Sequence, residues 1–94
     1  METSAGPVTN DVVVGSRVGL HARPAALVAQ AAAAQPVIVQ IAKDGAPVQA
    51  RSVLSLISLG AKCGDTVTLS AEGDGAPAAV AALAELIARD LDAE

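Results

Sequence analysis

Short segments with the hydrophobic pattern of a β-strand alternate along this chain with segments that have the pattern of a helix, and this order constrains the fold most. Strands are predicted over residues 8–14, 37–41, 48–50 and 66–71. Helices are predicted over residues 22–34 and 52–60 and from residues 73–77 onward, although a buried strand would also fit the run after Ser52. Because so short a chain must bury all these apolar faces together, we expect an α+β fold in the order β-α-β-β-α-β-α, with helices on one face of an antiparallel sheet.

Length and composition predict one small folded domain. The chain has 94 residues, of which 52% are hydrophobic and 17% are charged, and this balance argues against disorder. We expect a tail over residues 1–7, the domain over residues 8–92 and a short end over residues 93–94. The sequence shows no basic leader and no apolar run long enough to cross a bilayer, so a cytoplasmic protein is expected.

Three features of the composition argue against whole classes of function. The chain has no Phe, Trp or Tyr, so bases cannot stack on aromatic side chains as they do in many nucleic-acid-binding proteins. The net charge of -4 argues against a basic surface for nucleic acid. The single cysteine, Cys63, can form neither an internal disulfide nor a zinc site, which indicates a reducing compartment. No nucleic acid, metal, cofactor or membrane insertion is therefore expected.

Two local predictions concern a turn and the last helix. Asp44-Gly45 is typical of a type I′ hairpin turn, in which both central residues adopt positive φ. The last helix is expected to bury one stripe of side chains and to expose another. The buried stripe consists of Val80, Leu83, Ile87 and Leu91 with Ala84 beside them, and the exposed residues are Glu85, Arg89 and Asp92.

The segment best suited to chemistry surrounds the only histidine, in Gly19-Leu20-His21-Ala22-Arg23-Pro24. Pro24 is tolerated in the first turn of a helix because its missing N–H removes no helical hydrogen bond. His21 is therefore predicted at or just before a helix N-terminus, where the backbone N–H groups of Ala22 and Arg23 can bind an anion. The guanidinium of Arg23 adds donors suited to phosphate oxygens.

This setting favours an uncharged imidazole that acts as a nucleophile. The positive end of the helix dipole and the charge of Arg23 both disfavour protonation of His21, and the same groups would stabilise a phosphoryl group bound to the ring. The alternative interpretation is a histidine that only caps the helix or lies on the surface. A hydrolase is not indicated, because the segment holds no carboxylate, Ser or Cys that would complete a catalytic triad.

The segment around His21 resembles the phosphorylation motif of HPr, the histidine-containing phosphocarrier family of the bacterial phosphoenolpyruvate:sugar phosphotransferase system. A second motif of that family follows at the family's spacing, as Arg51-Ser52-Val53-Leu54-Ser55-Leu56-Ile57-Ser58-Leu59-Gly60. The resemblance covers residues 8–91 and implies an open-faced β-sandwich, in which three helices lie on one side of four antiparallel strands.

The resemblance also implies a function for the histidine segment. Phosphorylated enzyme I would phosphorylate His21 on Nδ1, Arg23 would orient the phosphate, and EIIA domains of sugar transporters would receive the group. Such a protein is a stoichiometric carrier and not an enzyme in the strict sense, and a monomer is expected.

An apolar docking surface for partner proteins is implied around His21. The matching residues here are Leu20, Ala26, Leu27, Val53, Leu54 and Ile57. The predicted helix after Ser52 carries more apolar side chains than one short helix can bury, so some of them should be exposed. Gln30 and Ala33 stand where many relatives carry lysines. The basic residues that could replace that charge are Arg17, Arg51 and Lys62.

Ser52 has a structural interpretation and a regulatory one. As a helix N-cap it would contribute about 0.5–2 kcal/mol of stability. The resemblance implies that an HPr kinase/phosphorylase could phosphorylate it, and a dianion beside the docking surface would weaken the binding of enzyme I. Two alternatives to a sugar relay stay open: a regulatory HPr-like module that acts through Ser52, and an HPr paralogue of the nitrogen-related branch. Regulatory relatives of this kind lack the active histidine, whereas His21 is present here.

Overall fold

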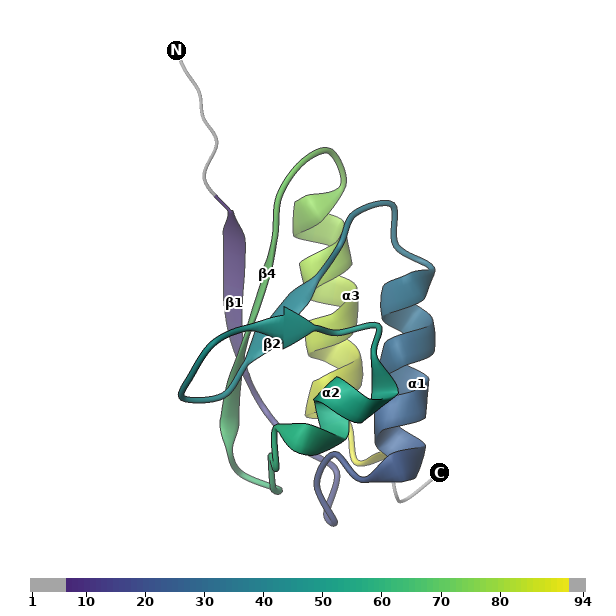
Figure 1. Ribbon diagram of the computed structural model, residues 1–94, viewed down its shortest axis with the longest axis vertical. Helices are drawn as coiled ribbons and strands as arrows, with labels where there is room; N and C mark the ends of the chain where they lie inside the picture. The colour runs from purple at the N-terminus through teal and green to yellow at the C-terminus, as the bar shows by residue number, and fades with distance from the viewer. Residues whose placement is uncertain (1–6, 92–94) are drawn as a thin grey trace.

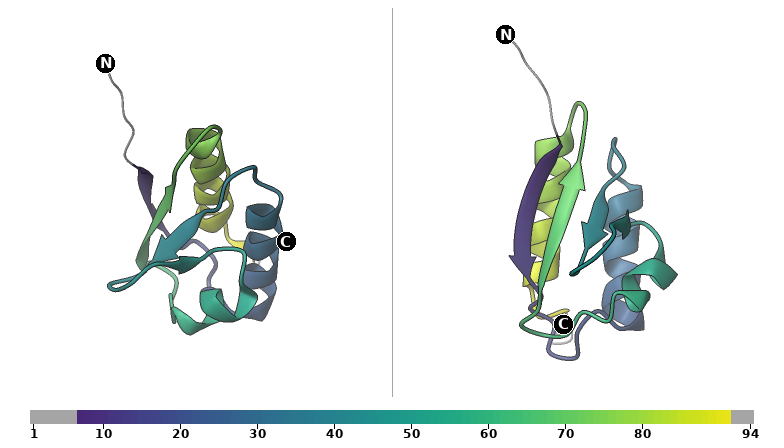
Figure 2. Two further views of the ribbon diagram at one scale, coloured as in Figure 1. Left: turned by 45° about the horizontal axis from the view of Figure 1, so that its top comes forward. Right: turned by 60° about the vertical axis from the view of Figure 1, so that its left-hand side comes forward.

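The computed structural model describes residues 7–91, which form one open sheet with helices packed on one side of it (Figure 1, Figure 2). The elements are β1 (Val8–Val13), α1 (Ala22–Ala33), β2 (Gln40–Ala42), β3 (Val48–Gln49), α2 (Val53–Ser58), β4 (Thr66–Ala71) and α3 (Ala76–Ala88). The predicted order and the α+β class are confirmed. The predictions for Asp92 and for nearly all of the tail over residues 1–7 lie outside the described residues.

The sheet has the strand order β1-β4-β2-β3, and every neighbouring pair is antiparallel. β1 pairs with β4 along its whole length, from Val8 opposite Ala71 to Val13 opposite Thr66. Side chains alternate between the two faces of a strand. In β4 the buried residues are Val67, Leu69 and Ala71, while Thr66 is exposed. The alternation in residues 66–71 therefore predicted both the strand and its buried face correctly.

An aliphatic core fills the space between the sheet and the helices. Its large members come from both layers, with Ile41 and Leu69 from the sheet and Leu56, Leu83 and Ile87 from the helices. Each such side chain contributes about 1.5–3 kcal/mol through burial. The remaining buried residues are mostly Val and Ala. Small alanine side chains line the buried side of α1, which packs against α2 and α3: Ala25, Ala29 and Ala32.

The structure corrects three local predictions. Of the two residues predicted to form the turn, Asp44 has a positive φ of 60° and Gly45 does not. The reason is that β2 and β3 are joined by a longer loop and not by a two-residue type I′ turn. The last helix ends at Ala88, although Leu91 beyond it is still buried, since the chain turns back over the core. The strand predicted over residues 37–41 begins only at Gln40.

Candidate functional site

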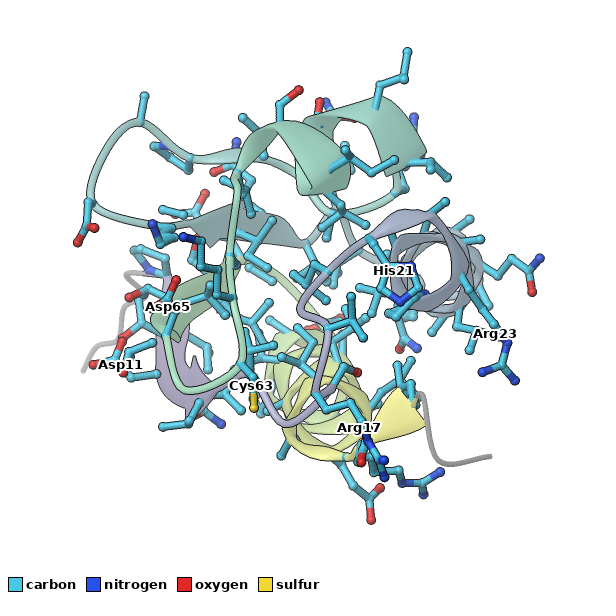
Figure 3. The ribbon with its side chains drawn as sticks, turned by 90° about the horizontal axis from the view of Figure 1, so that it is seen from below. Asp11, Arg17, His21, Arg23, Cys63 and Asp65 are labelled. Atoms are coloured by element: carbon cyan, nitrogen blue, oxygen red, sulfur yellow. The ribbon has the colours of Figure 1, made fainter. Side chains whose placement is uncertain are left out.

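His21 lies at the N-cap of α1, at the end of the molecule where the loop after β1, the turn before β4 and the end of α3 meet (Figure 1, Figure 3). Its backbone is extended, with φ −81° and ψ −170°, and its carbonyl accepts a hydrogen bond from the N–H of Ala25 at 2.9 Å. The imidazole makes no capping hydrogen bond to the helix, and the residue is half-buried. The structure thus places His21 where the pattern around Pro24 predicted it.

The first turn of α1 offers N–H groups beside His21. The helix itself supplies no acceptor for the N–H groups of Ala22 and Arg23, which are its first two residues, and Pro24 has no N–H to satisfy. Both residues are exposed, and the positive end of the helix dipole lies at the same place. An anionic group carried by the imidazole would be stabilised there.

The guanidinium of Arg23 points in a direction that the sequence did not predict. Its Nη1 donates a hydrogen bond to the carbonyl oxygen of Leu91 at 2.7 Å, and the guanidinium points away from the ring of His21 (Figure 3). A partner 68 residues further along the chain cannot be inferred from the local motif, and the role of this guanidinium at a phosphoryl group stays a prediction. Because the residue is exposed, a change of side-chain rotamer is enough to redirect the guanidinium.

The backbone just before His21 is fixed by Gly19 and Leu20. Gly19 has a φ of 84°, and a Cβ at this position would lie 2.5 Å from the carbonyl oxygen of Ala61. The N–H of Leu20 donates to that same oxygen at 3.0 Å. Leu20 is only 4% exposed, because this contact holds it where its side chain packs into the core. The prediction that Leu20 belongs to a docking surface is therefore wrong.

The docking surface is accordingly defined here as Ala26, Leu27, Val53, Leu54 and Ile57. Leu54 is 78% exposed and Ile57 is also exposed, whereas the other three are half-buried. Leu56, on the opposite side of α2, is fully buried, so the expected split between core and exposed apolar residues is observed. Sequence reasoning missed Val18, which is 65% exposed in the loop before His21. An apolar residue next to a loop glycine was the available signal.

The remaining predicted residues show one agreement and one correction. Ser52 is the N-cap of α2, and its Oγ accepts a hydrogen bond from the N–H of Ser55 at 3.2 Å, as the capping prediction requires. Arg17 cannot simply replace the missing lysine charge, because its Nη2 lies 2.8 Å from the carboxylate of Asp90. Arg51 and Lys62 are exposed.

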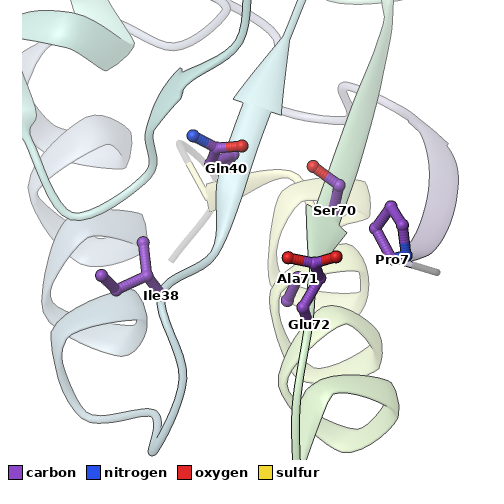
Figure 4. Close-up of a pocket in the computed structure, with 6 residues that line it drawn as sticks. All are labelled: Pro7, Ile38, Gln40, Ser70, Ala71 and Glu72. Atoms are coloured by element: carbon purple, nitrogen blue, oxygen red, sulfur yellow. The ribbon is translucent and has the colours of Figure 1, made fainter. Parts of the chain in front are cut away.

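A cavity of about 240 Å³ lies away from His21 (Figure 4). The cavity lies at the Ala71 end of β4 and is lined by Pro7, Ile38, Gln40, Ser70, Ala71 and Glu72. The loop that leads to His21 is instead hydrogen-bonded near the opposite end of β4, where the N–H of Val14 donates to the carbonyl oxygen of Asp65. In residues 7–91, no three His, Cys, Asp or Glu side chains are grouped as metal ligands would be. Within the same range, no helix combines the length and hydropathy needed to span a membrane.

Comparisons with known proteins agree in naming one family. The family model described as "PTS HPr component phosphorylation site" matches residues 8–89. Phosphocarrier protein HPr of Streptomyces coelicolor is 48% identical over 82 residues, covering 86% of this chain and 88% of that protein. The HPr-like protein Crh of Halalkalibacterium halodurans is 40% identical over 83 residues, covering 88% and 99%. The crystal structure of HPr from Bacillus anthracis has a TM-score of 0.82 at 38% identity, covering 86% of this chain and 96% of that one.

Proposed function

Because the chain belongs to the HPr family of the phosphotransferase system, we propose that it accepts a phosphoryl group on His21 from phosphorylated enzyme I and donates it to EIIA domains of sugar transporters. The observation that supports this most is the position of His21 at the N-cap of α1, next to the first N–H groups of the helix. The protein would act in the cytoplasm as a monomeric carrier, restored to its starting form by each donation.

The accepting step needs only the imidazole and the groups around it. An unprotonated ring nitrogen of His21, Nδ1 by family resemblance, attacks the phosphorus. The bond from phosphorus to the donor atom of enzyme I then breaks, and its electron pair leaves with the donor. The added negative charge lies at the start of α1, near the N–H groups of Ala22 and Arg23. Donation to EIIA is the same displacement with a new nucleophile.

Arg23 would assist by exchanging partners. At rest its guanidinium donates to the neutral carbonyl of Leu91. A phosphoryl oxygen is a charged acceptor, so the guanidinium would gain there the attraction of an opposite charge in addition to a hydrogen bond. Phosphorylation of His21 therefore favours rotation of Arg23 toward the phosphoryl group.

Partner proteins would bind through the docking surface on α1 and α2. Leu54 and Ile57 are large apolar side chains exposed to solvent on α2, which packs against α1. Apolar side chains grouped in this way are typical of protein interfaces. Arg51 and Lys62 would add positive charge at the rim, where an acidic partner could meet them.

A second candidate function is a regulatory HPr-like module phosphorylated on Ser52 by an HPr kinase/phosphorylase. Its support is the similarity to the HPr-like protein Crh and the place of Ser52 at the N-cap of α2, directly before docking residue Val53. The presence of His21 favours the relay over this role. A paralogue of the nitrogen-related branch would use the same chemistry with different partners.

One assay separates these functions. The protein is incubated with enzyme I and phosphoenolpyruvate labelled on the phosphate, and the label is then tested for stability in acid and base. The relay predicts acid-labile, base-stable label that is absent from His21→Ala and still present in Ser52→Ala. Absence of acid-labile label would contradict the relay. Acid-stable label after a parallel incubation with an HPr kinase/phosphorylase and a labelled nucleoside triphosphate, lost in Ser52→Ala, would then support the regulatory module.

A small chemical phosphoryl donor shows whether His21 is reactive without enzyme I. Phosphoramidate carries a phosphoryl group that a histidine can accept without a partner protein, with release of ammonia. Label from phosphoramidate but not from enzyme I would show a reactive imidazole that enzyme I does not serve. It would contradict the proposed donor and leave the proposed acceptor in place.

A further inference from the structure

The C-terminal end of α3 and the residues directly after it are packed against the loop that leads to His21. The N–H of Gly15 donates to the carbonyl oxygen of Ile87 at 3.0 Å. A Cβ at Gly15 would lie 2.0 Å from the carbonyl oxygen of Ala88, so only glycine allows the two backbones to approach this closely. The loop over residues 15–20, here called the acceptor loop, thus begins on the C-terminal end of α3.

Ser16 extends this contact to the turn after the helix, residues 89–91. Its side chain is fully buried, the hydroxyl donates to the carbonyl oxygen of Arg89 at 3.4 Å, and the N–H of Leu91 donates to the hydroxyl at 3.1 Å. A serine hydroxyl can serve in both roles at once. It therefore pairs backbone groups that the end of α3 leaves without helical partners.

Asp90 holds the next residue of the acceptor loop. Its Oδ1 accepts from the backbone N–H of Arg17 at 3.2 Å, and its Oδ2 accepts from Nε of the same residue at 2.9 Å. One carboxylate thus restrains both the backbone and the guanidinium of Arg17. Because the pair lies at the surface, solvent screens it, and its effect is modest.

We propose that Ser16 and Asp90 are positioning residues of the phosphoacceptor site, and this inference rests on the proposed function. Together they hold the acceptor loop on the turn over residues 89–91. The N–H of Gly19 donates to the carbonyl oxygen of Ser16 at 2.8 Å, which carries the restraint to the residues next to His21. Neither residue touches the reacting atoms. Both act through the backbone that presents the imidazole.

The same turn sets the resting place of Arg23. Leu91 donates its N–H to Ser16 and accepts with its carbonyl from Nη1 of Arg23. The loop that enters α1 and the arginine of its first turn therefore share one support. Transfer of a phosphoryl group depends on the alignment of the reacting atoms, whereas partner affinity depends on the docking surface, which lies on α1 and α2. Loss of the support should lower kcat and leave KM unchanged.

The first test measures enzyme I kinetics with this protein as the phosphoryl acceptor. Asp90→Asn should lower kcat about two- to fivefold, the range that a solvent-exposed ion pair can supply, with KM unchanged. The double variant Arg17→Asp/Asp90→Arg restores the side-chain pair in reverse but leaves the backbone N–H of residue 17 without its acceptor, so kcat should recover only in part. Glu85→Gln, a matched loss of charge on the exposed side of α3, should have no effect. An unchanged kcat in Asp90→Asn, or a raised KM alone, would overturn the proposal.

The second test needs no partner and so separates this proposal from the proposed function. Hydrogen exchange of the Gly19 amide, whose acceptor is the carbonyl of Ser16, is measured in Asp90→Asn and Ser16→Ala. Exchange should be faster about two- to fivefold in the first and more in the second, because the buried hydroxyl makes two hydrogen bonds. Should Ser16→Ala not fold, Asp90→Asn alone decides. Unchanged exchange of the Gly19 amide would contradict the proposal that Ser16 and Asp90 hold the acceptor loop in place. Failure of the wild type to accept phosphate would contradict only the proposed function.

Discussion

At the residue scale, the site consists of a half-buried imidazole at the N-cap of α1 and an exposed arginine in the first turn, whose guanidinium donates to the backbone carbonyl of Leu91. Pro24 predicted the place of His21, because a missing N–H is a local property that a short motif records. The direction of Arg23 could not be predicted in this way. Its partner, Leu91, lies in a turn that only the packing of α3 brings close.

Arg23→Ala tests the role of that arginine. Removing a charged donor from a phosphoryl acceptor site should slow transfer from enzyme I about tenfold or more, because hydrogen bonds to charged groups are worth about 1.5–3 kcal/mol. The exposed side chain leaves little core to disturb, so the free energy of unfolding should change by less than about 1 kcal/mol. Single-turnover transfer rates and urea unfolding give the two values. Arg89→Ala is the matched control, and equal rates for Arg23→Ala and wild type would remove Arg23 from the site.

At the scale of elements, the helices were predicted by their end signals as much as by their apolar stripes. Ser52 and Gly60 limit α2 and settle the choice between helix and buried strand, because the N-cap hydrogen bond to Ser55 exists only in a helix. The Asp44-Gly45 turn was wrong because the pairing of Ile41 with Val48 leaves more than two residues in the loop, and pairing between strands is not a property of the turn residues. The core position of Leu20 had the same kind of cause, a contact with a distant turn.

Ser52→Ala should lower the free energy of unfolding by about 0.5–2 kcal/mol, since the N–H of Ser55 loses its acceptor. Ser58→Ala is the control within the same helix. Its hydroxyl is exposed and donates only to the carbonyl of Leu54, one turn back, so its loss should cost little. Urea denaturation measures both. Equal stability of the two variants would show that the cap contributes nothing.

Gly15→Ala tests the close approach between the acceptor loop and α3. The new Cβ would meet the carbonyl oxygen of Ala88 at 2.0 Å, a contact between backbones that no rotamer relieves, and overpacking of this kind costs about 1–3 kcal/mol. In Gly45→Ala the nearest atom is 3.9 Å away and φ is not positive, so stability should be unchanged or higher. Thermal and urea unfolding compare the pair. Equal stability of Gly15→Ala and wild type would mean that the loop does not pack there in solution.

At the scale of the whole molecule, three segments far apart in the sequence meet at one end: the acceptor loop, the turn around Ala61 and the turn over residues 89–91. The class of fold followed from counting apolar faces, because a short chain has few ways to bury them. The meeting of these segments did not, since Ser16 and Asp90 carry no pattern of their own. The exposed side chains of α2 were predictable as a surplus of apolar residues and not as individual positions.

Leu54→Ala and Leu56→Ala separate docking from folding on one helix. Leu54 is exposed, so its truncation should leave the free energy of unfolding within about 0.5 kcal/mol of wild type. It should raise the KM for enzyme I about fivefold, which corresponds to about 1 kcal/mol of lost contact. Leu56 is fully buried, and its truncation should cost about 2–5 kcal/mol of stability. An unchanged KM for Leu54→Ala would place the partner contact elsewhere.

The most direct measurement of the central claim is phosphorus–proton correlation by NMR after reaction with enzyme I and phosphoenolpyruvate. We expect one phosphorus signal that correlates with the ring protons of His21 in the pattern of an Nδ1 adduct and disappears when EIIA is added. A phosphorus signal that correlates with the Cβ protons of Ser52, or no signal on the imidazole at all, would contradict it.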